Sequence, residues 1–196
     1  IQDDFLYLFE KNYNYAAPLP LGNGDIFKAL EKVKEFKQSV CGNNLVYCIG
    51  EDKVKLFEDK YQVSELNDFF EYVYLTEDLI NLSGRKFHGK RNHLNQFIKN
   101  YQYTYENITA SDIPLVMNLM DQWSRKKEHS VNLDVEKKAI YEILNYDIGA
   151  DYRAGAILTD NQVVAFAIGE QISDDMACVY FEKADTDIKG SYAVIN

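Results

Sequence analysis

The chain has 196 residues, of which 46% are hydrophobic and 14% aromatic, so it can bury a core and is not a disordered protein. Its formal net charge of −10 argues against general coating of nucleic acid, although an acidic body can still carry a local basic groove. No apolar run approaches the roughly 20 residues of a membrane span, and three cysteines without a CxxC pair indicate reduced thiols in a cytoplasmic protein.

The first half of the chain predicts short strands that alternate with helices. Runs of aromatic and β-branched residues predict strands, and apolar residues at a period near 3.6 predict helices. In chain order we expect a strand at 5–11, a turn-rich loop at 17–25, a helix at 25–40, a strand at 44–50, a helix at 51–61, a strand at 70–76 and a helix at 77–82. Gly42 is expected to end the first of these helices.

After Tyr101 the pattern restarts. It predicts a strand at 101–107, helices at 109–127 and 134–146, strands at 153–159, 162–172 and 177–185, and a helix beginning near Gly190. Asp160–Asn161 forms a two-residue hairpin turn in this interpretation. A strand, two helices, an antiparallel three-strand meander and a helix follow one another in the GNAT (acetyltransferase-type) layout. Because the first half looks like a rougher copy, we predict a mixed α/β protein of two GNAT-like modules in tandem, at 1–98 and 99–196.

One segment departs from the acidic character of the chain. Residues 83–101 hold five lysines and arginines, two of the three histidines and no acidic residue. On a helical projection, an apolar stripe of core-facing width contains Phe87, Leu94, Phe97, Ile98 and Tyr101. Lys90 falls inside this stripe and Arg91 lies just beyond its edge, whereas Asn92 lies on the opposite, solvated side.

Three interpretations of these charges stay open at the level of sequence. The lysine stems can cover apolar surface while their heads reach water, or the charges can pair with the acidic remainder of the chain. Alternatively, Lys90 and Arg91 point into a cleft that holds a phosphate or carboxylate, which arginine binds with its fork and lysine as a point charge.

The same region carries a specific resemblance. It matches a pattern of Asp/Glu-Tyr-x-Tyr, Asp-Leu, Leu-x-Gly-x-Lys and Lys-Arg-Asn-His through Glu71, Tyr72, Tyr74, Asp78, Leu79, Leu82, Gly84, Lys86, Lys90, Arg91, Asn92 and His93. Further matches are Trp123, Glu136, Gly169–Glu170, Phe181–Asp185, Gly190 and Asn196. In these residues the chain resembles an uncharacterised bacterial family related to the C-terminal domain of phosphatidylglycerol lysyltransferase.

The resemblance implies a tandem GNAT-like fold shared with Fem-type and other aminoacyl-tRNA-dependent transferases. It implies an aminoacyltransferase that takes its aminoacyl group from the acceptor end of tRNA and passes it to an anionic lipid headgroup or a small acceptor. Lys86, Lys90, Arg91, Asn92, Trp123 and Asn196 would then bind substrate. Members of the family continue into an Asn-Arg-Glu and Leu-Arg-x-x-Lys segment that this sequence does not contain, so we expect the second module to be incomplete at its C-terminus.

Aminoacyl transfer asks the protein to orient a nucleophile, to assist proton transfer and to stabilise an oxyanion. Glu182 and Lys183 are candidates on the strand that borders the expected cleft, and Glu170 is the alternative base. Alternation along a strand predicts that Glu182 and Lys183 do not share one cleft. Each of them can equally be a surface residue or part of an ion pair. Trp123 can be a core residue or a stacking platform.

No cofactor is expected, and coenzyme A is disfavoured. The segment 185–193 has one usable glycine, Gly190, with Tyr192 where the pyrophosphate loop of GNAT enzymes needs a small residue, and Asp185 and Asp187 would repel phosphate there. His88 and His93 lack metal-ligand spacing, and no Gly-x-Ser-x-Gly occurs. The alternative to an enzyme is a non-catalytic GNAT-like module that binds a small anion or a protein partner.

Overall fold

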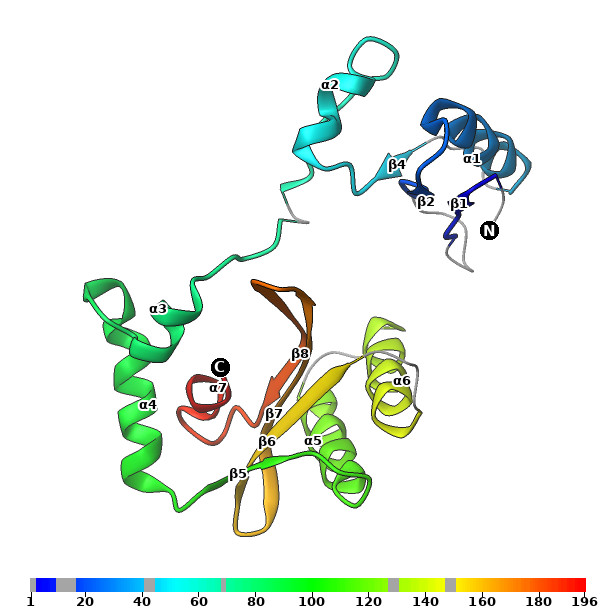
Figure 1. Cartoon of the computed structure of the whole chain (residues 1–196). Coiled ribbons are helices and arrows are strands. Elements are labelled where there is room, and N and C mark those ends of the chain that lie inside the picture. Colours follow the sequence, from blue (N-terminus) through cyan, green and yellow to red (C-terminus); the bar gives the residue numbers. More distant parts are fainter. Residues whose placement is uncertain (1–2, 10–16, 41–44, 68–69, 127–130, 147–150) are drawn as a thin grey trace. The chain divides into compact units, whose positions relative to one another are not determined.

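The computed structural model describes residues 3–9, 17–40, 45–67, 70–126, 131–146 and 151–196. They fall into two compact units, residues 1–71 and 72–196 (Figure 1). Helices combined with several β-sheets confirm the predicted mixed α/β class. The units divide at 71/72, whereas the predicted module boundary at 98/99 lies inside a helix of the second unit. Both that boundary and the tandem arrangement of GNAT-like modules stay predictions.

Unit 1 is built around a single long helix. α1 (Ile26–Val40) confirms the helix predicted at 25–40, and the carboxylate of Asp25 accepts a hydrogen bond of 3.0 Å from the backbone N–H of Phe27 at its start. Its buried face carries Leu30, which packs with Leu19 and Phe57 in a small core. This face explains why the helix forms, since isolated helices of this length gain most of their stability from tertiary packing.

The strand predicted at 44–50 is shorter than expected, and the loop predicted at 17–25 is wrong in part, because it contains two short strands that find pairing partners. β1 (Phe5–Leu6) pairs antiparallel with β3 (Leu21–Gly22), and β2 (Ala17–Pro18) pairs parallel with β4 (Val46–Tyr47). The helix predicted at 51–61 is present as η1 (Glu51–Lys53) followed by α2 (Val54–Phe57). Gly42 and the end of the strand predicted at 5–11 lie outside the described residues.

The strand predicted at 70–76 is wrong. Residues 70–75 form no regular structure, and none of the described strands pairs with them. Their side chains are largely exposed, with Tyr72 at 86% and Val73 at 82%. Strand-forming side chains favour a sheet only where a neighbouring strand and a buried face are available, so composition alone misled the prediction here.

Unit 2 contains a four-stranded antiparallel sheet in the order β5-β6-β7-β8. Its strands are β5 (Thr104–Asn107), β6 (Tyr152–Thr159), β7 (Gln162–Ser173) and β8 (Met176–Ala184). The predicted turn between β6 and β7 is confirmed, because Asp160 and Asn161 both adopt positive φ angles, of 49° and 60°. This is the left-handed pair that a two-residue type I′ hairpin requires.

Helices cover both faces of this sheet (Figure 1). On one face, α5 (Ile113–Arg125) and α6 (Val131–Asn145) enclose a core that includes Val116, Met120, Ile140 and Phe166. On the other face, α4 (His88–Asn100) and α7 (Ser191–Ile195) pack around Phe97, Val164, Ala165 and Ala184. α3 (Thr76–Asn81) confirms the helix predicted at 77–82. It is followed by η3 (Arg85–Phe87), which leads into α4.

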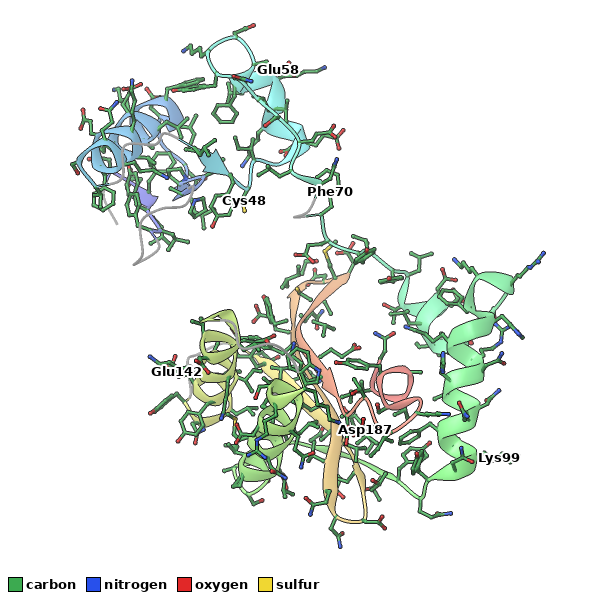
Figure 2. The ribbon with its side chains drawn as sticks, turned by 180° about the vertical axis from the view of Figure 1, so that it is seen from behind. Cys48, Glu58, Phe70, Lys99, Glu142 and Asp187 are labelled. Carbon is green, nitrogen blue, oxygen red and sulfur yellow. The ribbon has the colours of Figure 1, made fainter. Side chains whose placement is uncertain are left out.

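The apolar stripe predicted for α4 is largely correct. Phe97 is completely buried and Phe87 is 9% exposed, whereas Ile98 is 48% exposed and lies at the edge of the stripe. Figure 2 shows Lys99 on the side of α4 that points away from the sheet, as the helical projection predicts. α4 therefore presents one side to the core and leaves a row of polar residues beside it.

Cys48 and Cys178 are free thiols, as predicted, and Cys41 lies outside the described residues. None of the helices in the described ranges combines the length and the apolar character needed to cross a membrane.

Candidate functional site

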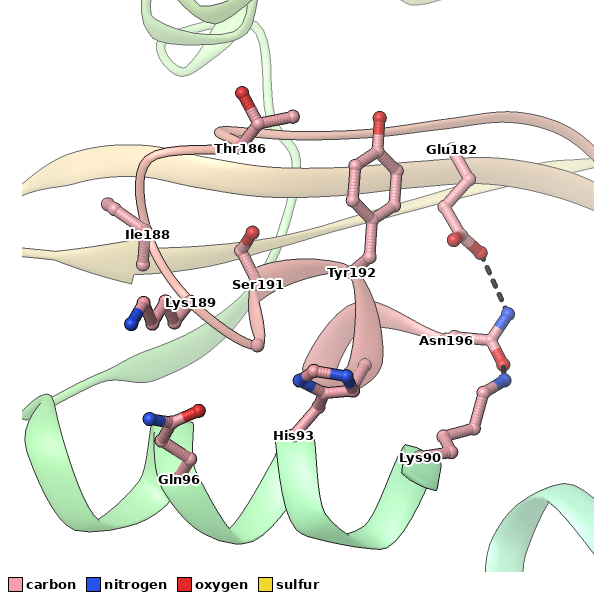
Figure 3. Close-up of a pocket in the computed structure, with 12 residues that line it drawn as sticks. Lys90, His93, Gln96, Glu182, Thr186, Ile188, Lys189, Ser191, Tyr192 and Asn196 are labelled. Carbon is pink, nitrogen blue, oxygen red and sulfur yellow. Dashed lines mark hydrogen bonds between the residues drawn. The ribbon is translucent and has the colours of Figure 1, made fainter. Parts of the chain in front are cut away.

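An open pocket of about 720 Å³ lies in unit 2 between α4, α7 and the loop that follows β8 (Figure 3). α4 contributes Lys90, His93 and Gln96 at intervals of three residues, which places them along one side of the helix. β8 contributes Glu182, and α7 with its flanking residues contributes Tyr192 and Asn196. Two of the predicted binding residues and the first predicted base thus line one cavity.

Gly190 allows α7 to lie against α4. Its φ angle is +89°, in the left-handed region where glycine carries little steric cost. A Cβ atom at this position would lie 2.4 Å from the carbonyl oxygen of His93 and 2.9 Å from the Cβ of Phe97. Only glycine therefore satisfies both the backbone angle and the close approach to α4 that closes this side of the pocket.

Asn196 links two opposite charges in the pocket. Its side-chain nitrogen donates a hydrogen bond of 2.9 Å to Oε2 of Glu182, and its side-chain oxygen accepts a hydrogen bond from Nζ of Lys90 (Figure 3). Lys90 has three N–H donors and uses one of them here. The arrangement holds a carboxylate and an ammonium group in one cavity without a direct contact between them.

Lys183 lies on the opposite face of the sheet from Glu182, as the alternation of strand residues predicts. Its Nζ is 2.8 Å from Oε1 of Glu136 on α6 and 4.3 Å from the centre of the Trp123 ring on α5. The Lys183 side chain is only 14% exposed. Lys183 thus matches the ion-pair interpretation, and it does not line the pocket.

Trp123 is half-buried, so it is neither a fully buried core residue nor an open stacking platform. One side of its ring faces the ammonium of Lys183, and its indole Nε1–H donates a hydrogen bond of 3.1 Å to the hydroxyl oxygen of Tyr192. Tyr192 also lines the pocket, although its sequence position indicated only a residue that disfavours coenzyme A binding. A signal was present, because Tyr192 stands four residues before Asn196 and shares its side of a helix.

Glu170 lies away from the pocket. It accepts a short hydrogen bond from the hydroxyl of Tyr180 on β8, and this bond raises the pKa of Tyr180 to about 12. The ring of Tyr180 also packs edge-on against Tyr152, with 5.9 Å between the ring centroids. The carboxylate that was predicted as the alternative base is therefore engaged at a separate position.

Arg91 does not line the pocket. Its guanidinium donates hydrogen bonds to the carbonyl oxygens of Leu82 and Gly84, the latter at 2.8 Å. Leu82 ends α3 in a left-handed conformation with φ of 46°, and Gly84 begins η3 with φ of +84°. Arg91 thus satisfies carbonyl groups that the turn between these helices leaves without helical partners.

Replacing Arg91 by alanine is expected to destabilise the fold by about 1.5–3 kcal/mol, because a charged donor is lost from two carbonyl groups. Lysine is expected to restore only part of this stability, since its ammonium does not reproduce the fixed planar direction of the two N–H groups of Nη1. Denaturant unfolding measures the effect, with Arg85→Ala as the control because Arg85 is exposed on the same turn. Unchanged stability of Arg91→Ala would contradict a structural role.

Lys86 and Asn92 also lie outside the pocket. Lys86 forms an ion pair of 2.8 Å with Asp78, which matches the predicted pairing with acidic residues. Asn92 is exposed and its amide nitrogen lies 3.1 Å from Nε2 of His88 on the same helix. Of the four basic-segment residues predicted to bind substrate, only Lys90 reaches the cavity.

The loop after β8 carries a compact ion-pair network. Lys126 lies 2.7 Å from carboxylate oxygens of both Asp185 and Asp187, and these partners raise its pKa. Burial works against ionisation of Asp185, but hydrogen bonds from Lys126 and from the backbone of Asp187 outweigh it and lower the pKa of that carboxyl. The two aspartates are thus partly neutralised, which weakens the argument that they repel a phosphate. In the part of the chain that the structure describes, no cluster of three or more His, Cys, Asp or Glu residues could hold a metal ion.

Residues 3–196 match the family described as phosphatidylglycerol lysyltransferase, C-terminal. The chain belongs to this family. The match confirms the resemblance inferred from the motif residues.

Two solved structures have a similar architecture. A conserved protein of unknown function from Bacteroides thetaiotaomicron is 28% identical, with a TM-score of 0.78 over 98% of this chain and 68% of that one. A domain described as the C-terminal domain of a lysylphosphatidylglycerol synthetase from Agrobacterium fabrum is 15% identical, with a TM-score of 0.50 over 97% of this chain and 65% of that one. The second likeness supports the fold alone. No curated protein is similar enough to the chain to count as a relative.

Proposed function

We propose that the chain is a cytoplasmic aminoacyltransferase that moves an aminoacyl group from aminoacyl-tRNA to an anionic lipid headgroup or a small acceptor. Its family is named after a lysyltransferase that acts on phosphatidylglycerol. The observation that carries the proposal is the pocket in which Asn196 holds the Glu182 carboxylate beside the Lys90 ammonium. In this proposal the chain carries two GNAT-like modules in tandem, and the tRNA acceptor end is the partner.

The proposed chemistry is an ester exchange. The nucleophile of the acceptor attacks the carbonyl carbon of the aminoacyl ester, and the bond from that carbon to the ribose oxygen breaks. Glu182 accepts the proton of the nucleophile and passes it to the departing ribose oxygen, so that protons and electron pairs balance. Asn196 leaves the other oxygen of Glu182 without a protein hydrogen-bond partner among the described residues, which makes it available to the nucleophile.

Lys90 has the complementary role. Its ammonium lies on the other side of the Asn196 amide from Glu182 and has donors to spare. A positive charge fixed in a partly enclosed pocket stabilises the negative charge that develops on the carbonyl oxygen in the transition state. The same positive charge of Lys90 can also bind the phosphate of an anionic acceptor.

No further cofactor is required in this proposal, because the ester of aminoacyl-tRNA is already activated. Coenzyme A remains disfavoured in the proposal on steric grounds. The side chain of Tyr192 occupies the position of a small residue in the pyrophosphate loop of GNAT enzymes. Trp123 and Asn196 are retained in the proposal as supporting residues of the pocket.

The experiment is a transfer assay with the full chain, using tRNA charged with a radiolabelled amino acid and vesicles that contain phosphatidylglycerol, or small amine and hydroxyl acceptors. Lys90→Ala is expected to lower the transfer rate by about 100-fold, the lower end of the range for loss of one oxyanion-stabilising donor. Lys99→Ala is the matched control, because Lys99 is a lysine of the same helix that faces solvent.

Three outcomes decide between the alternatives. Loss of transfer in Lys90→Ala with retention in Lys99→Ala supports the proposal. Equal rates for Lys90→Ala and the parent would remove the pocket from the reaction. No transfer by the parent with any charged tRNA, together with a thermal shift by a small anion, would favour a non-catalytic binding module, since a ligand that binds only the folded state raises Tm.

A further inference from the structure

Contacts outside the helix hold α7 (Ser191–Ile195) in place. At its start, the hydroxyl of the buried Ser191 donates a hydrogen bond of 2.7 Å to the carbonyl oxygen of Asp185. Towards its end, Val194 and Ile195 pack on the core between α4 and the sheet. These contacts hold the side of α7 that faces the core.

The side of α7 that borders the pocket depends on a different contact. Tyr192 is 38% exposed, and its hydroxyl oxygen accepts the hydrogen bond of 3.1 Å from Nε1–H of Trp123. Trp123 belongs to α5, which packs on the other face of the sheet, so this bond passes around the edge strand β8 and connects the two helical layers. It is a long-range contact, between residues 69 positions apart in the sequence.

The donor side of this bond is itself fixed. The ammonium of Lys183 lies over the ring of Trp123, and Oε1 of Glu136 on α6 holds that ammonium at 2.8 Å. A cation over an indole face is one of the stronger contacts of this kind, particularly when the cation is shielded from water as Lys183 is. The indole N–H therefore points at Tyr192 from a ring whose orientation is restricted by two other elements.

Tyr192 and Asn196 are four residues apart, so they lie on the same side of the helix. The backbone N–H of Asn196 also donates a hydrogen bond of 3.4 Å to the carbonyl oxygen of Tyr192. A rotation of α7 that displaces Tyr192 must displace Asn196, and Asn196 is the residue that holds Glu182 and Lys90.

We infer that Trp123 and Tyr192 are positioning residues of the pocket: the Trp123–Tyr192 hydrogen bond, backed by Lys183 and Glu136, fixes the rotation of α7 and thereby the contacts of Asn196 with Glu182 and Lys90. The Lys183–Glu136 ion pair, which lies on the face of the sheet opposite the pocket, thus contributes to the position of a pocket residue. The effect on transfer rests on the proposed function, whereas the effect on Asn196 does not.

The test is nuclear magnetic resonance of the full chain, observing the side-chain amide group of Asn196. Its two N–H signals are identified as the pair that disappears in Asn196→Ala. Tyr192→Phe, which removes one oxygen atom and keeps the ring, is expected to shift or broaden these signals. Trp123→Phe is expected to change them in the same direction, and the double variant is expected to differ little from either single variant, because all three lack the same bond.

Tyr180→Phe is the matched control, because it also removes a tyrosine hydroxyl. That hydroxyl donates its hydrogen bond to Glu170 on β7, outside the pocket. The Asn196 signals are expected to stay unchanged in it. Unmoved Asn196 signals in Tyr192→Phe, or equal changes in Tyr180→Phe, would overturn the inference.

Transfer assays add a second readout. Tyr192→Phe and Trp123→Phe are each expected to lower the transfer rate by about two- to tenfold, the equivalent of one net hydrogen bond. If the parent transfers nothing, the proposed function fails while the resonance experiment still decides the positioning role. If transfer falls but the Asn196 signals do not move, the positioning role fails while the proposed function stands.

Discussion

Replacing Glu182 by glutamine is expected to lower the transfer rate by about 10²- to 10⁴-fold, the range over which a positioned general base contributes. Glutamine keeps the size of the side chain, and its amide oxygen can still accept the hydrogen bond from Nδ2 of Asn196. The fold and the affinity for substrate are therefore expected to change little. The measurements are the transfer rate at saturating substrate, and the melting temperature as a check on folding.

The control for this variant is Glu170→Gln. Glu170 is a glutamate of the adjacent strand β7, but it is engaged by the hydroxyl of Tyr180 and lies outside the pocket. Its replacement is expected to leave the transfer rate within about a factor of two, as for a surface position away from the site. A larger loss in Glu170→Gln than in Glu182→Gln would move the role of general base to Glu170.

Replacing Gly190 by alanine is expected to destabilise the protein by about 2–5 kcal/mol. The estimate combines the cost of a left-handed backbone for alanine with the cost of overpacking against α4. The new Cβ would lie 2.4 Å from the carbonyl oxygen of His93, a backbone atom that cannot move aside without shifting the helix. Denaturant unfolding of the full chain measures the loss.

Two other glycines separate the cost of the left-handed backbone from the cost of overpacking. Gly84 has a φ angle of +84° but no atom within 4 Å of an added Cβ, so Gly84→Ala reports the backbone cost alone. Gly89 has no positive φ angle and equally open surroundings, and it lies in α4, so Gly89→Ala is expected to leave stability unchanged or slightly raised. If Gly190→Ala cost no more than Gly84→Ala, the close packing of α7 on α4 would be contradicted.

Most of the secondary structure of unit 2 could be predicted from the sequence because its longer helices and strands bury apolar residues. The meander of β6, β7 and β8 follows from short runs of apolar residues and the Asp160–Asn161 turn. The strand expected at 70–76 failed for the opposite reason. Its composition is typical of strands, but a strand also needs a partner strand, and the local sequence does not show which segments pair.

The residues of the candidate site could likewise be predicted only in part. The helical projection of α4 placed Lys90 inside the apolar stripe, and in the structure Lys90 does reach the cavity beside the core. The projection also grouped Arg91 with it, but it could not show that the carbonyl groups of a left-handed turn nearby would bind the guanidinium. Tyr192 was missed because its contact with Trp123 joins residues that only the tertiary structure brings together.

The amide of Asn196 has a consequence for the electrical character of the pocket. A neutral spacer that accepts from the cation and donates to the anion keeps the two charges apart, so neither cancels the other. An electric field therefore runs across the pocket from the Lys90 ammonium on α4 towards the Glu182 carboxylate on β8. A polar bond that enters this space will turn its oxygen to the helix and present its acidic hydrogen to the strand, before any reaction begins.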